Sequence, residues 1–253
     1  KLWIFIILPA TAVAFAVRER RGQVRGAEKW GWRVALVGYV IATLSAVAGA
    51  LRAYLVGKGD EVDGVEVRAM VPVNLRQPED EGKLGNRFGL VALVLPVGIE
   101  NPLARLYETR ARMESLKNSY QAALTLTVLG AVGITPKLIQ QQVLDLLASK
   151  ATAVMTNVPG PTSALYLAGA RLTQPLFWVP QSGDIGIGVS ILSYDGSVQI
   201  GLMTDDNLVA DPELIVRGFA REFERLLMLV LMEPWDRLGD PEAVEAGLEG
   251  EAA

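Results

Sequence analysis

Asn157-Val-Pro-Gly-Pro161 ends a short apolar segment, and Gly183-Asp-Ile-Gly-Ile-Gly-Val-Ser-Ile-Leu-Ser-Tyr-Asp-Gly196 lies further along the chain. The segment before the first motif, Ala151 to Met155, is short, apolar and partly β-branched, which predicts a buried strand. The two prolines of the motif remove backbone donors and fix φ, so regular strand pairing must stop there. Gly160 between them can adopt backbone conformations that a side chain forbids.

The second stretch predicts a β-hairpin. Its bulky positions are Ile185, Ile187, Val189 and Ile191, and the positions between them are Gly186, Gly188, Ser190 and Leu192. Such a strand has one bulky face and one nearly bare face. Tyr194-Asp195-Gly196-Ser197 carries an Asp-Gly turn signal, and Val198, Ile200 and Leu202 form the return strand. The bare face either packs closely against other backbone or lines a ligand channel.

Five motifs in this chain occur in a familiar order. They are Val71-Pro-Val-Asn-Leu-Arg76, Leu84-Gly-Asn-Arg-Phe-Gly-Leu90, Asn157-Val-Pro-Gly-Pro161, Leu165-Tyr-Leu-Ala-Gly-Ala-Arg171 and Ile191-Leu-Ser-Tyr-Asp-Gly196. Together they resemble the C-terminal half of the bacterial wax ester synthase/diacylglycerol acyltransferase family, over roughly Ala46 to Leu229. The resemblance implies one half of a chloramphenicol-acetyltransferase-like fold, of which the coenzyme A-dependent acyltransferases carry two.

The resemblance also implies a reaction. The family transfers a fatty acyl group from coenzyme A to a fatty alcohol or a diacylglycerol, and its catalytic HHxxxDG motif lies in the N-terminal half. The second His of that motif is taken to deprotonate the acceptor hydroxyl, which needs a base. This chain contains no His. We therefore assign it no catalytic residue, no metal and no cofactor, and acyl-CoA enters only as the substrate that the resemblance implies.

Composition narrows the classes of function. The 253 residues suffice for one large domain or two small ones, and a hydrophobic fraction of 51% supplies a sizeable core. The net charge of −4 argues against a general nucleic-acid binder. Because Cys is absent, disulfides and cysteine nucleophiles are excluded.

Residues 1–58 form an apolar region with two interpretations. Leu2 to Val17 and Val34 to Leu51 carry no charge and flank a basic segment, which is typical of a membrane hairpin with a cytoplasmic loop. On this interpretation the protein is membrane-associated and its soluble domain is cytoplasmic. Alternatively, the second run is the buried helix of a soluble domain, since Ala46 to Leu55 matches the family's first helix. An Asn-Asp pair that precedes this helix in the family is replaced here by Val40-Ile41.

Residues 59–235 are predicted to form the acyltransferase C-terminal-like domain, and 236–253 an acidic tail. The predicted order of elements in this domain is two strands, helices, a strand, the hairpin and a last helix. This order predicts an α/β fold in which helices pack on a mixed sheet, and apolar helices precede it at the N-terminus. One predicted helix has a basic face, formed by Arg105, Arg110, Arg112 and Lys117. This face is either solvated, or it binds acidic lipid headgroups or a phosphate of coenzyme A. The apolar helical region from Tyr120 to Ser149 either packs in the core or docks on a membrane or lipid droplet.

The candidate site residues form two groups. The first is expected to line an acyl or acceptor tunnel, or the interface with an N-terminal half: Asn157, Val158, Pro159, Gly160, Pro161, Gly186, Gly188 and Ser190. The second contains the polar residues of the two upstream motifs, Asn74, Arg76, Asn86 and Arg87, whose alternative role is to satisfy backbone and loop groups.

Two functions therefore stay open. In one, the chain is the C-terminal half of an acyltransferase that shapes the tunnel for O-acyl transfer, with an N-terminal catalytic half as its partner. In the other, it is a non-catalytic, membrane-anchored scaffold subunit derived from that fold.

Overall fold

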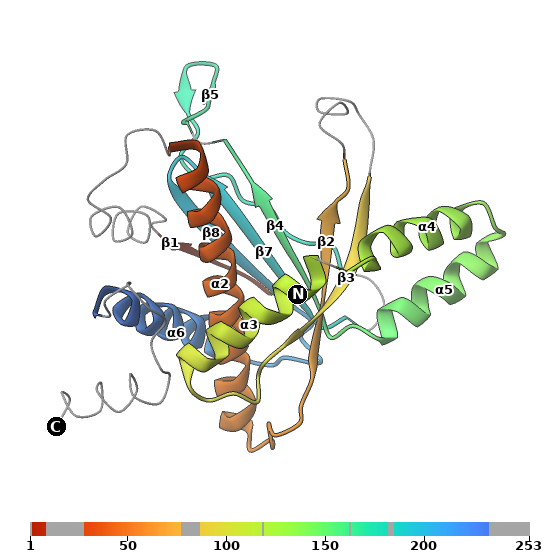
Figure 1. Cartoon of the computed structure of the whole chain (residues 1–253), viewed down its shortest axis with the longest axis horizontal. Coiled ribbons are helices and arrows are strands. Elements are labelled where there is room, and N and C mark those ends of the chain that lie inside the picture. Colours follow the sequence, from red (N-terminus) through yellow and green to blue (C-terminus); the bar gives the residue numbers. More distant parts are fainter. Residues whose placement is uncertain are drawn as a thin grey trace.

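The computed structural model describes residues 2–8, 28–76, 87–117, 119–161, 163–181 and 185–232, and side chains only within residues 38–229 (Figure 1). Four predictions lie wholly or partly outside the described residues: the role of Asn86, residues 9–17 of the first apolar run, most of the basic segment after it, and the acidic tail 236–253.

A six-stranded sheet forms the centre of the molecule, in the order β1-β8-β7-β4-β2-β3. Its strands are β1 (Leu2–Leu8), β2 (Val67–Asn74), β3 (Phe88–Leu95), β4 (Ala153–Pro159), β7 (Ile187–Tyr194) and β8 (Ser197–Thr204). β2 and β3, β7 and β8, and β1 and β8 pair antiparallel, whereas β4 is parallel to β2 and to β7. This confirms the predicted mixed sheet.

The predicted hairpin is also present. β7 and β8 pair from Ile187↔Thr204 to Tyr194↔Ser197. The turn residues Asp195 and Gly196 have φ of 47° and 76°. Two successive positive φ angles are those of a type I′ turn, whose twist matches that of the flanking strands.

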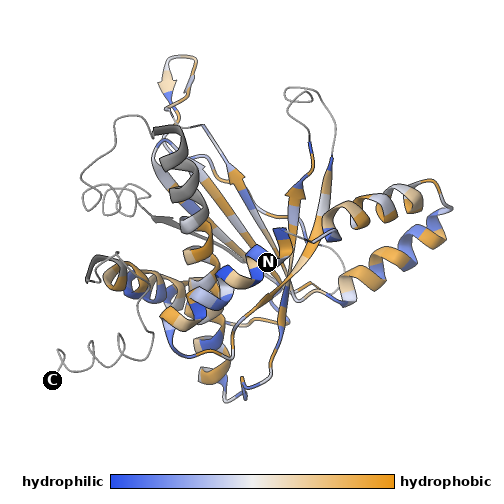
Figure 2. Cartoon of the chain, in the orientation of Figure 1, coloured by the Kyte–Doolittle hydropathy of each residue, from blue (hydrophilic) through white to orange (hydrophobic). Residues whose placement is uncertain are grey.

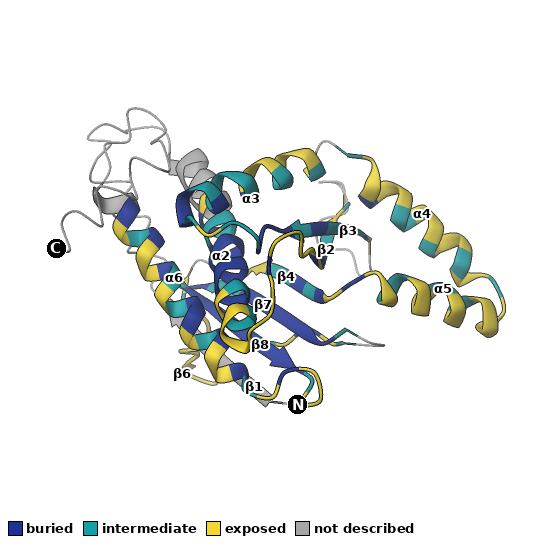
Figure 3. Ribbon diagram, turned by 90° about the horizontal axis from the view of Figure 1, so that it is seen from below, coloured by how far each residue is buried: buried dark blue, intermediate teal, exposed yellow. Residues whose placement is uncertain are grey.

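Three helices pack on the sheet: α2 (Glu28–Lys58), α3 (Pro102–Lys117) and α6 (Pro212–Met232). The bulky faces of β7 and β8, with Val189 and Ile200, are buried against α2 and α6, with Val47 and Phe219, in one hydrophobic core (Figure 3). Two further helices, α4 (Gln121–Gly133) and α5 (Lys137–Ser149), form a hairpin that projects from this body (Figure 1).

The first apolar run contains a strand where a helix was expected. Leu2–Leu8 pairs antiparallel with β8, from Leu2↔Thr204 to Leu8↔Val198. The prediction of an N-terminal helix is therefore wrong for these residues. A short, wholly apolar run cannot be assigned to helix or strand from periodicity alone, and the edge of β8 supplies the missing backbone partners.

The second apolar run is helical and lies inside the protein. Within the described residues, Gly38–Lys58 is the one helix long and apolar enough to cross a membrane, and half of it is buried in the protein. Ala46, Ala48 and Ala50 are wholly buried in the core. A core helix satisfies the same criteria of length and composition, and this packing favours that interpretation of the second run.

Arg105 was expected on a basic face that is either solvated or bound to acidic headgroups or a coenzyme A phosphate, but it is buried instead. Its side chain is 1% exposed and pairs with the carboxylate of Glu222 on α6. Nε donates to the carbonyl of Ser45 at 3.2 Å, and Nη1 donates to the carbonyls of Ile99 and Glu100 at 2.9 Å each. A β-carbon at Gly49 would lie 2.5 Å from both partners of the ion pair, so glycine leaves room for it. Arg105 therefore joins α2, α3 and α6.

Candidate substrate and half-interface site

The predicted site residues gather mainly at the edge of the sheet where the parallel strands β2, β4 and β7 have their carboxyl ends. Asn157 to Pro159 end β4, where they pair with Ile191 to Ser193 near the end of β7. Asn74 ends the parallel strand β2 and pairs with Phe88, so it lies at the same edge together with Arg76 and Arg87. β2 and β4 share only the pairs Ala69↔Ala153 and Met70↔Val154, and beyond these they diverge toward this edge (Figure 1).

Gly160 is required for space rather than for an unusual backbone conformation. Its N–H donates to the carbonyl of Ser193 at 2.9 Å, and the Asp195 N–H donates to the carbonyl of Pro161 at 3.0 Å. A β-carbon at Gly160 would overlap the Ser193 carbonyl oxygen. Gly160 is not among the residues with positive φ, so the expected conformational role is wrong. The glycine lets the chain after β4 stay against β7.

Tyr194 connects this edge to a short arm. The arm consists of β5 (Tyr166–Leu167) and β6 (Ala170–Arg171), which lie apart from the main sheet (Figure 1). The buried Tyr194 hydroxyl donates to the carbonyl of Leu172 at 2.7 Å and accepts the N–H of Leu165 at 2.8 Å. Both ends of the arm are therefore fixed by one side chain, a role that the turn signal and the motif around Tyr194 do not predict.

An ion pair ties the arm to the hairpin turn. Arg171 Nη2 lies 2.7 Å from the Asp195 carboxylate, and this hydrogen bond raises the pKa of Arg171 above its usual value. Three of the family-like motifs are thus held together by Gly160, Tyr194 and Asp195; two of them are neighbours in the sequence and the third lies further along the chain.

Replacing Tyr194 with phenylalanine is expected to release the arm. The ring would still fill its site, but the Leu165 N–H and the Leu172 carbonyl would lose their partner, at a cost of about 1–3 kcal/mol. Hydrogen exchange at Leu167 to Ala170 should accelerate, whereas exchange in β8 should change little. Equal protection of the arm in both proteins would show that Tyr194 does not hold it.

The bare face of β7 is covered by the chain itself. The Ser190 hydroxyl donates to the carbonyl of Phe177 at 2.9 Å, and the Gln181 amide donates to the carbonyl of Met203 at 3.2 Å. A β-carbon at Gly188 would lie 3.2 Å from Gln181 Nε2, and one at Gly186 would lie 2.8 Å from Leu208 Cδ1. These contacts favour the close-packing interpretation of the glycines. Gly186 and Gly188 also lie at the end of β7 opposite to Asn157–Pro161.

A valine at position 188 is therefore expected to lower the stability of the domain. Its branched side chain suits a strand, but it would displace Gln181 from the Met203 carbonyl, and overpacking costs about 1–3 kcal/mol. Thermal melting of Gly188→Val checks this. A melting temperature equal to that of wild type would mean that the glycine face of β7 is open enough for the tunnel interpretation.

The upstream motif residues have local roles that the structure describes in part. Asn74 Oδ1 accepts the Arg76 N–H at 3.0 Å, and the Leu75 N–H donates to the carbonyl of Arg87 at 3.0 Å. These bonds close the start of the β2–β3 connection. Val40 and Ile41, the positions at which the resemblance implies an Asn-Asp pair in the family, are half-buried in α2.

The described residues contain no cluster of three or more acidic, His or Cys side chains that could hold a metal ion. Asp205, in the Asp205-Asp206-Asn207 stretch, instead accepts the Asn207 N–H at 3.0 Å within a turn.

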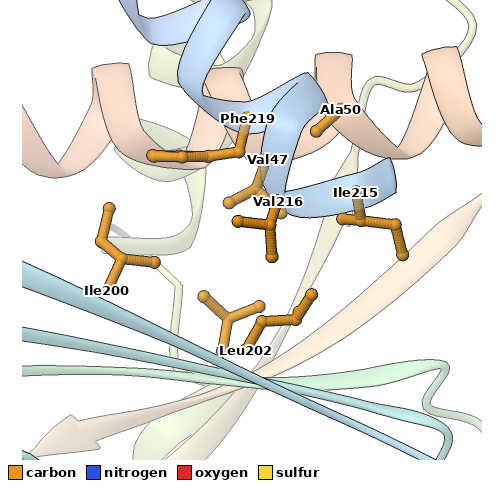
Figure 4. A pocket seen from close by; sticks show the side chains of 8 residues that line it. Val47, Ala50, Ile200, Leu202, Ile215, Val216 and Phe219 are labelled. Carbon is orange, nitrogen blue, oxygen red and sulfur yellow. The ribbon is translucent and has the colours of Figure 1, made fainter. Parts of the chain in front are cut away.

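A cavity of about 20 Å³ lies between α2, α6 and the sheet (Figure 4). Its lining is wholly apolar and includes Val47, Leu202, Ile215 and Phe219. It has room for about one water molecule. An acyl chain does not fit there, so this cavity is a packing defect of the core rather than a tunnel.

Exposed apolar side chains lie on the arm and on the segment that follows it. They are Leu165, Tyr166, Leu167, Leu172, Leu176 and Trp178. Exposed aromatic and aliphatic side chains are common on surfaces that contact another molecule. This surface adjoins the edge that carries Asn157–Pro161, because the same chain segment connects them.

Known proteins that are similar in sequence point to one family. The family model described as "WS/DGAT C-terminal domain" matches residues 84–227. A protein of Mycobacterium tuberculosis (strain ATCC 25618 / H37Rv), "Probable diacyglycerol O-acyltransferase tgs1", is 29% identical over 198 residues, which are 74% of this chain and 41% of that protein. "Probable diacyglycerol O-acyltransferase tgs2" of the same strain is 32% identical over 168 residues, 64% of this chain and 36% of that protein.

Solved structures show the same fold. "Wax ester synthase/diacylglycerol acyltransferase from Marinobacter aquaeolei VT8" matches with a TM-score of 0.60 and 17% identity, over 90% of this chain and 49% of that one. The nonribosomal peptide synthetase FmoA3 matches with a TM-score of 0.57 and 18% identity, over 95% of this chain and 23% of that one. These likenesses confirm the predicted fold, a mixed sheet with helices packed on it that matches one half of the wax ester synthase structure. The chain spans less than half the length of these relatives.

Proposed function

The chain belongs to the WS/DGAT C-terminal domain family, and we propose on that premise that it serves as the C-terminal half of an O-acyltransferase. In this role it shapes the acyl and acceptor site, while a separate N-terminal half supplies the catalytic base. One observation carries the proposal. Hydrogen bonds and an ion pair join Asn157–Pro161, the turn after Tyr194 and the arm at one edge of the sheet, beside exposed apolar side chains.

The chemistry requires a second half. An alcohol acceptor must lose its proton as it attacks the thioester of acyl-CoA, and this needs a base with a pKa nearer neutrality. The chain has no His. Among the carboxylates of the described site, Asp195 is already paired with Arg171 and Asp205 accepts a backbone N–H within its turn. The base is therefore proposed to come from an HHxxxDG motif in the partner half.

A non-catalytic scaffold is the alternative. Two observations favour it: the chain has no His, and Val40-Ile41 stand where the family has its Asn-Asp pair. In that role the same edge and arm would bind other protein subunits without shaping a reaction site.

The two functions are distinguished by producing this chain together with an N-terminal half that carries HHxxxDG and is encoded upstream or in a neighbouring gene. We expect the halves to co-purify and to transfer palmitate from palmitoyl-CoA to hexadecanol or diolein. The chain alone should give no turnover above buffer, because a missing general base costs about 10²–10⁴-fold on its own.

Two variants sharpen this test. Leu167→Glu combined with Trp178→Asp places charges on the arm surface and should abolish co-purification and activity together. Leu214→Glu combined with Met228→Glu makes equivalent changes at exposed positions of α6 and should preserve both. Turnover by the chain alone would refute the need for a partner. Co-purification without turnover would favour the scaffold.

A further inference from the structure

The α4–α5 hairpin is attached to the body at one end only. At its base, the Thr125 hydroxyl lies 2.8 Å from the carbonyl of Leu90 on β3. A β-carbon at Gly89 would overlap the carbonyl of Ala122, so glycine lets α4 lie close to β3 there. Ala122 is the buried residue of α4, and α5 has none. The rest of the hairpin stands clear of the molecule (Figures 1 and 3). The core-packing interpretation of this region is therefore wrong beyond its first turn.

The projecting part of the hairpin exposes apolar side chains on both helices (Figure 2). Leu124 on α4 is 63% exposed, Ile134 at the tip is 89% exposed, and Leu138 on α5 is 72% exposed. The other large exposed apolar residues of the two helices are Val128, Ile139, Leu144 and Leu146. A soluble surface rarely places so many aliphatic side chains together without a ligand or partner.

Polar side chains accompany these apolar ones along α5. Lys137, Gln141, Gln142 and Asp145 are all exposed, and the Gln141 amide donates to the Asp145 carboxylate at 3.2 Å. An apolar centre with polar groups beside it is the composition of a protein interface. Inside an acyl layer, in contrast, the charges and amides of α5 would have no hydrogen-bonding partners. The mixed composition therefore favours a protein partner.

The charges of the hairpin are complementary to those of an identical hairpin. Between positions 121 and 149 the sequence has two charged residues, Lys137 and Asp145. They lie about 12 Å apart along α5, too far for the contact that residues one turn apart make. About a two-fold axis, residue i of one copy contacts residue j of the other, and j contacts i. An axis at Gln141, the midpoint, places each Lys137 opposite Asp145 of the other copy.

We propose that two copies of this chain associate through their α4–α5 hairpins, which pack antiparallel about a two-fold axis at Gln141 and form a four-helix bundle. Antiparallel helices packed around a shared apolar core form such bundles in soluble proteins. The exposed aliphatic side chains would supply the core, and the polar row of α5 would supply the rim. The proposal goes beyond the function proposed above and does not depend on it, because the hairpin lies apart from the arm (Figure 1).

The size of the hairpin sets the expected strength of this dimer. Each helix has 13 residues and is therefore about 20 Å long, and two helices side by side are about 20 Å wide. The flat area of this face, roughly 400 Å², is below the accessible area of about 800 Å² that each partner buries in a standard interface. We therefore expect a reversible dimer that dissociates on dilution.

Sedimentation of the full chain over a range of concentrations tests the proposal. Wild type should show a monomer–dimer equilibrium. Leu124→Glu combined with Leu138→Glu should weaken dimerisation at least about tenfold, because carboxylates would enter the apolar centre. Both side chains are exposed in the single chain, so the melting temperature of the monomer should not change.

The matched control is Leu214→Glu combined with Met228→Glu, at exposed positions of α6. This variant should dimerise like wild type. A wild type that stays monomeric at every concentration would overturn the proposal. So would equal dimerisation of wild type and of the variant at positions 124 and 138.

Charge reversals test whether the partner is a second copy. Lys137→Glu would place two carboxylates at each contact, and Asp145→Lys would place two ammonium groups there. Each variant alone should therefore dimerise about tenfold more weakly than wild type. A mixture of the two variants should regain the wild-type affinity, because every contact then joins opposite charges. If the mixture dimerises as weakly as each variant alone, the antiparallel arrangement is wrong.

Single cysteines test the arrangement directly, because the chain has no Cys of its own. Gln141→Cys lies at the proposed axis and should give disulfide-linked dimers under mild oxidation. Ile134→Cys should not, because the two tips would lie at least about 20 Å apart, beyond the reach of a disulfide. Dimers linked through position 134 but not through 141 would contradict the proposal. A monomeric wild type that binds phosphatidylcholine vesicles through Leu124 and Leu138 would overturn it and assign the surface to lipid.

Discussion

Replacing Arg105 with leucine is expected to destabilise the domain by about 3–5 kcal/mol, the usual cost of removing one partner from a buried ion pair. Glu222 would keep its charge in a site where it is 19% exposed, and the carbonyls of Ser45, Ile99 and Glu100 would lose their donor. A loss of this size is a large fraction of the stability of an ordinary domain. Denaturant unfolding of Arg105→Leu and wild type measures it.

The matched control lies on the same helix. Arg110 is 53% exposed and pairs with Glu114 one turn away at 2.8 Å, so Arg110→Leu should cost at most about 0.5 kcal/mol. The loss of stability in Arg105→Lys should lie between the losses in the two leucine variants. Lysine keeps the charge, but it lacks the planar guanidinium group that reaches four acceptors. Similar unfolding midpoints for the Arg105 and Arg110 leucine variants would contradict the proposed role of Arg105 in joining the helices.

Gly160→Ala is expected to lower stability by about 1–3 kcal/mol, although it adds only one methyl group. The new β-carbon would overlap the carbonyl oxygen of Ser193, which is backbone and cannot rotate away. The Gly160 N–H bond to that carbonyl would break, and the end of β4 would move away from β7. In the reconstituted enzyme proposed above, the same variant should also reduce acyl transfer, because this edge is part of the proposed site.

Gly130→Ala is the control, with the opposite expected sign. Gly130 lies in α4, and no atom lies within 4 Å of a β-carbon built there. Alanine should therefore stabilise the protein by about 0.5–1 kcal/mol, since it restricts the unfolded chain and suits a helix. Thermal and denaturant unfolding of both variants check the pair. A Gly160→Ala protein as stable as wild type would show that the close contact is not needed.

The sequence alone determined the parts of this protein that depend on neighbouring residues. Alternation from Ile187 to Ile191, followed by Asp195-Gly196, specified the hairpin and the place of its turn, because strand period and turn chemistry are local properties. The motif order from Val71 to Gly196 was enough to indicate the family, which the family model over residues 84–227 then matched.

Tertiary structure decided what depends on residues that are distant in sequence. Arg105 is buried because Ser45 and Glu222, 60 and 117 residues away, come to it. The glycine face of β7 is covered because Phe177 and Gln181 fold back over it. Leu2–Leu8 is a strand because β8 offers an edge. An apolar run, a basic residue or a bare strand face has the same local pattern whether it meets water or protein, so only the assembled fold selects between them.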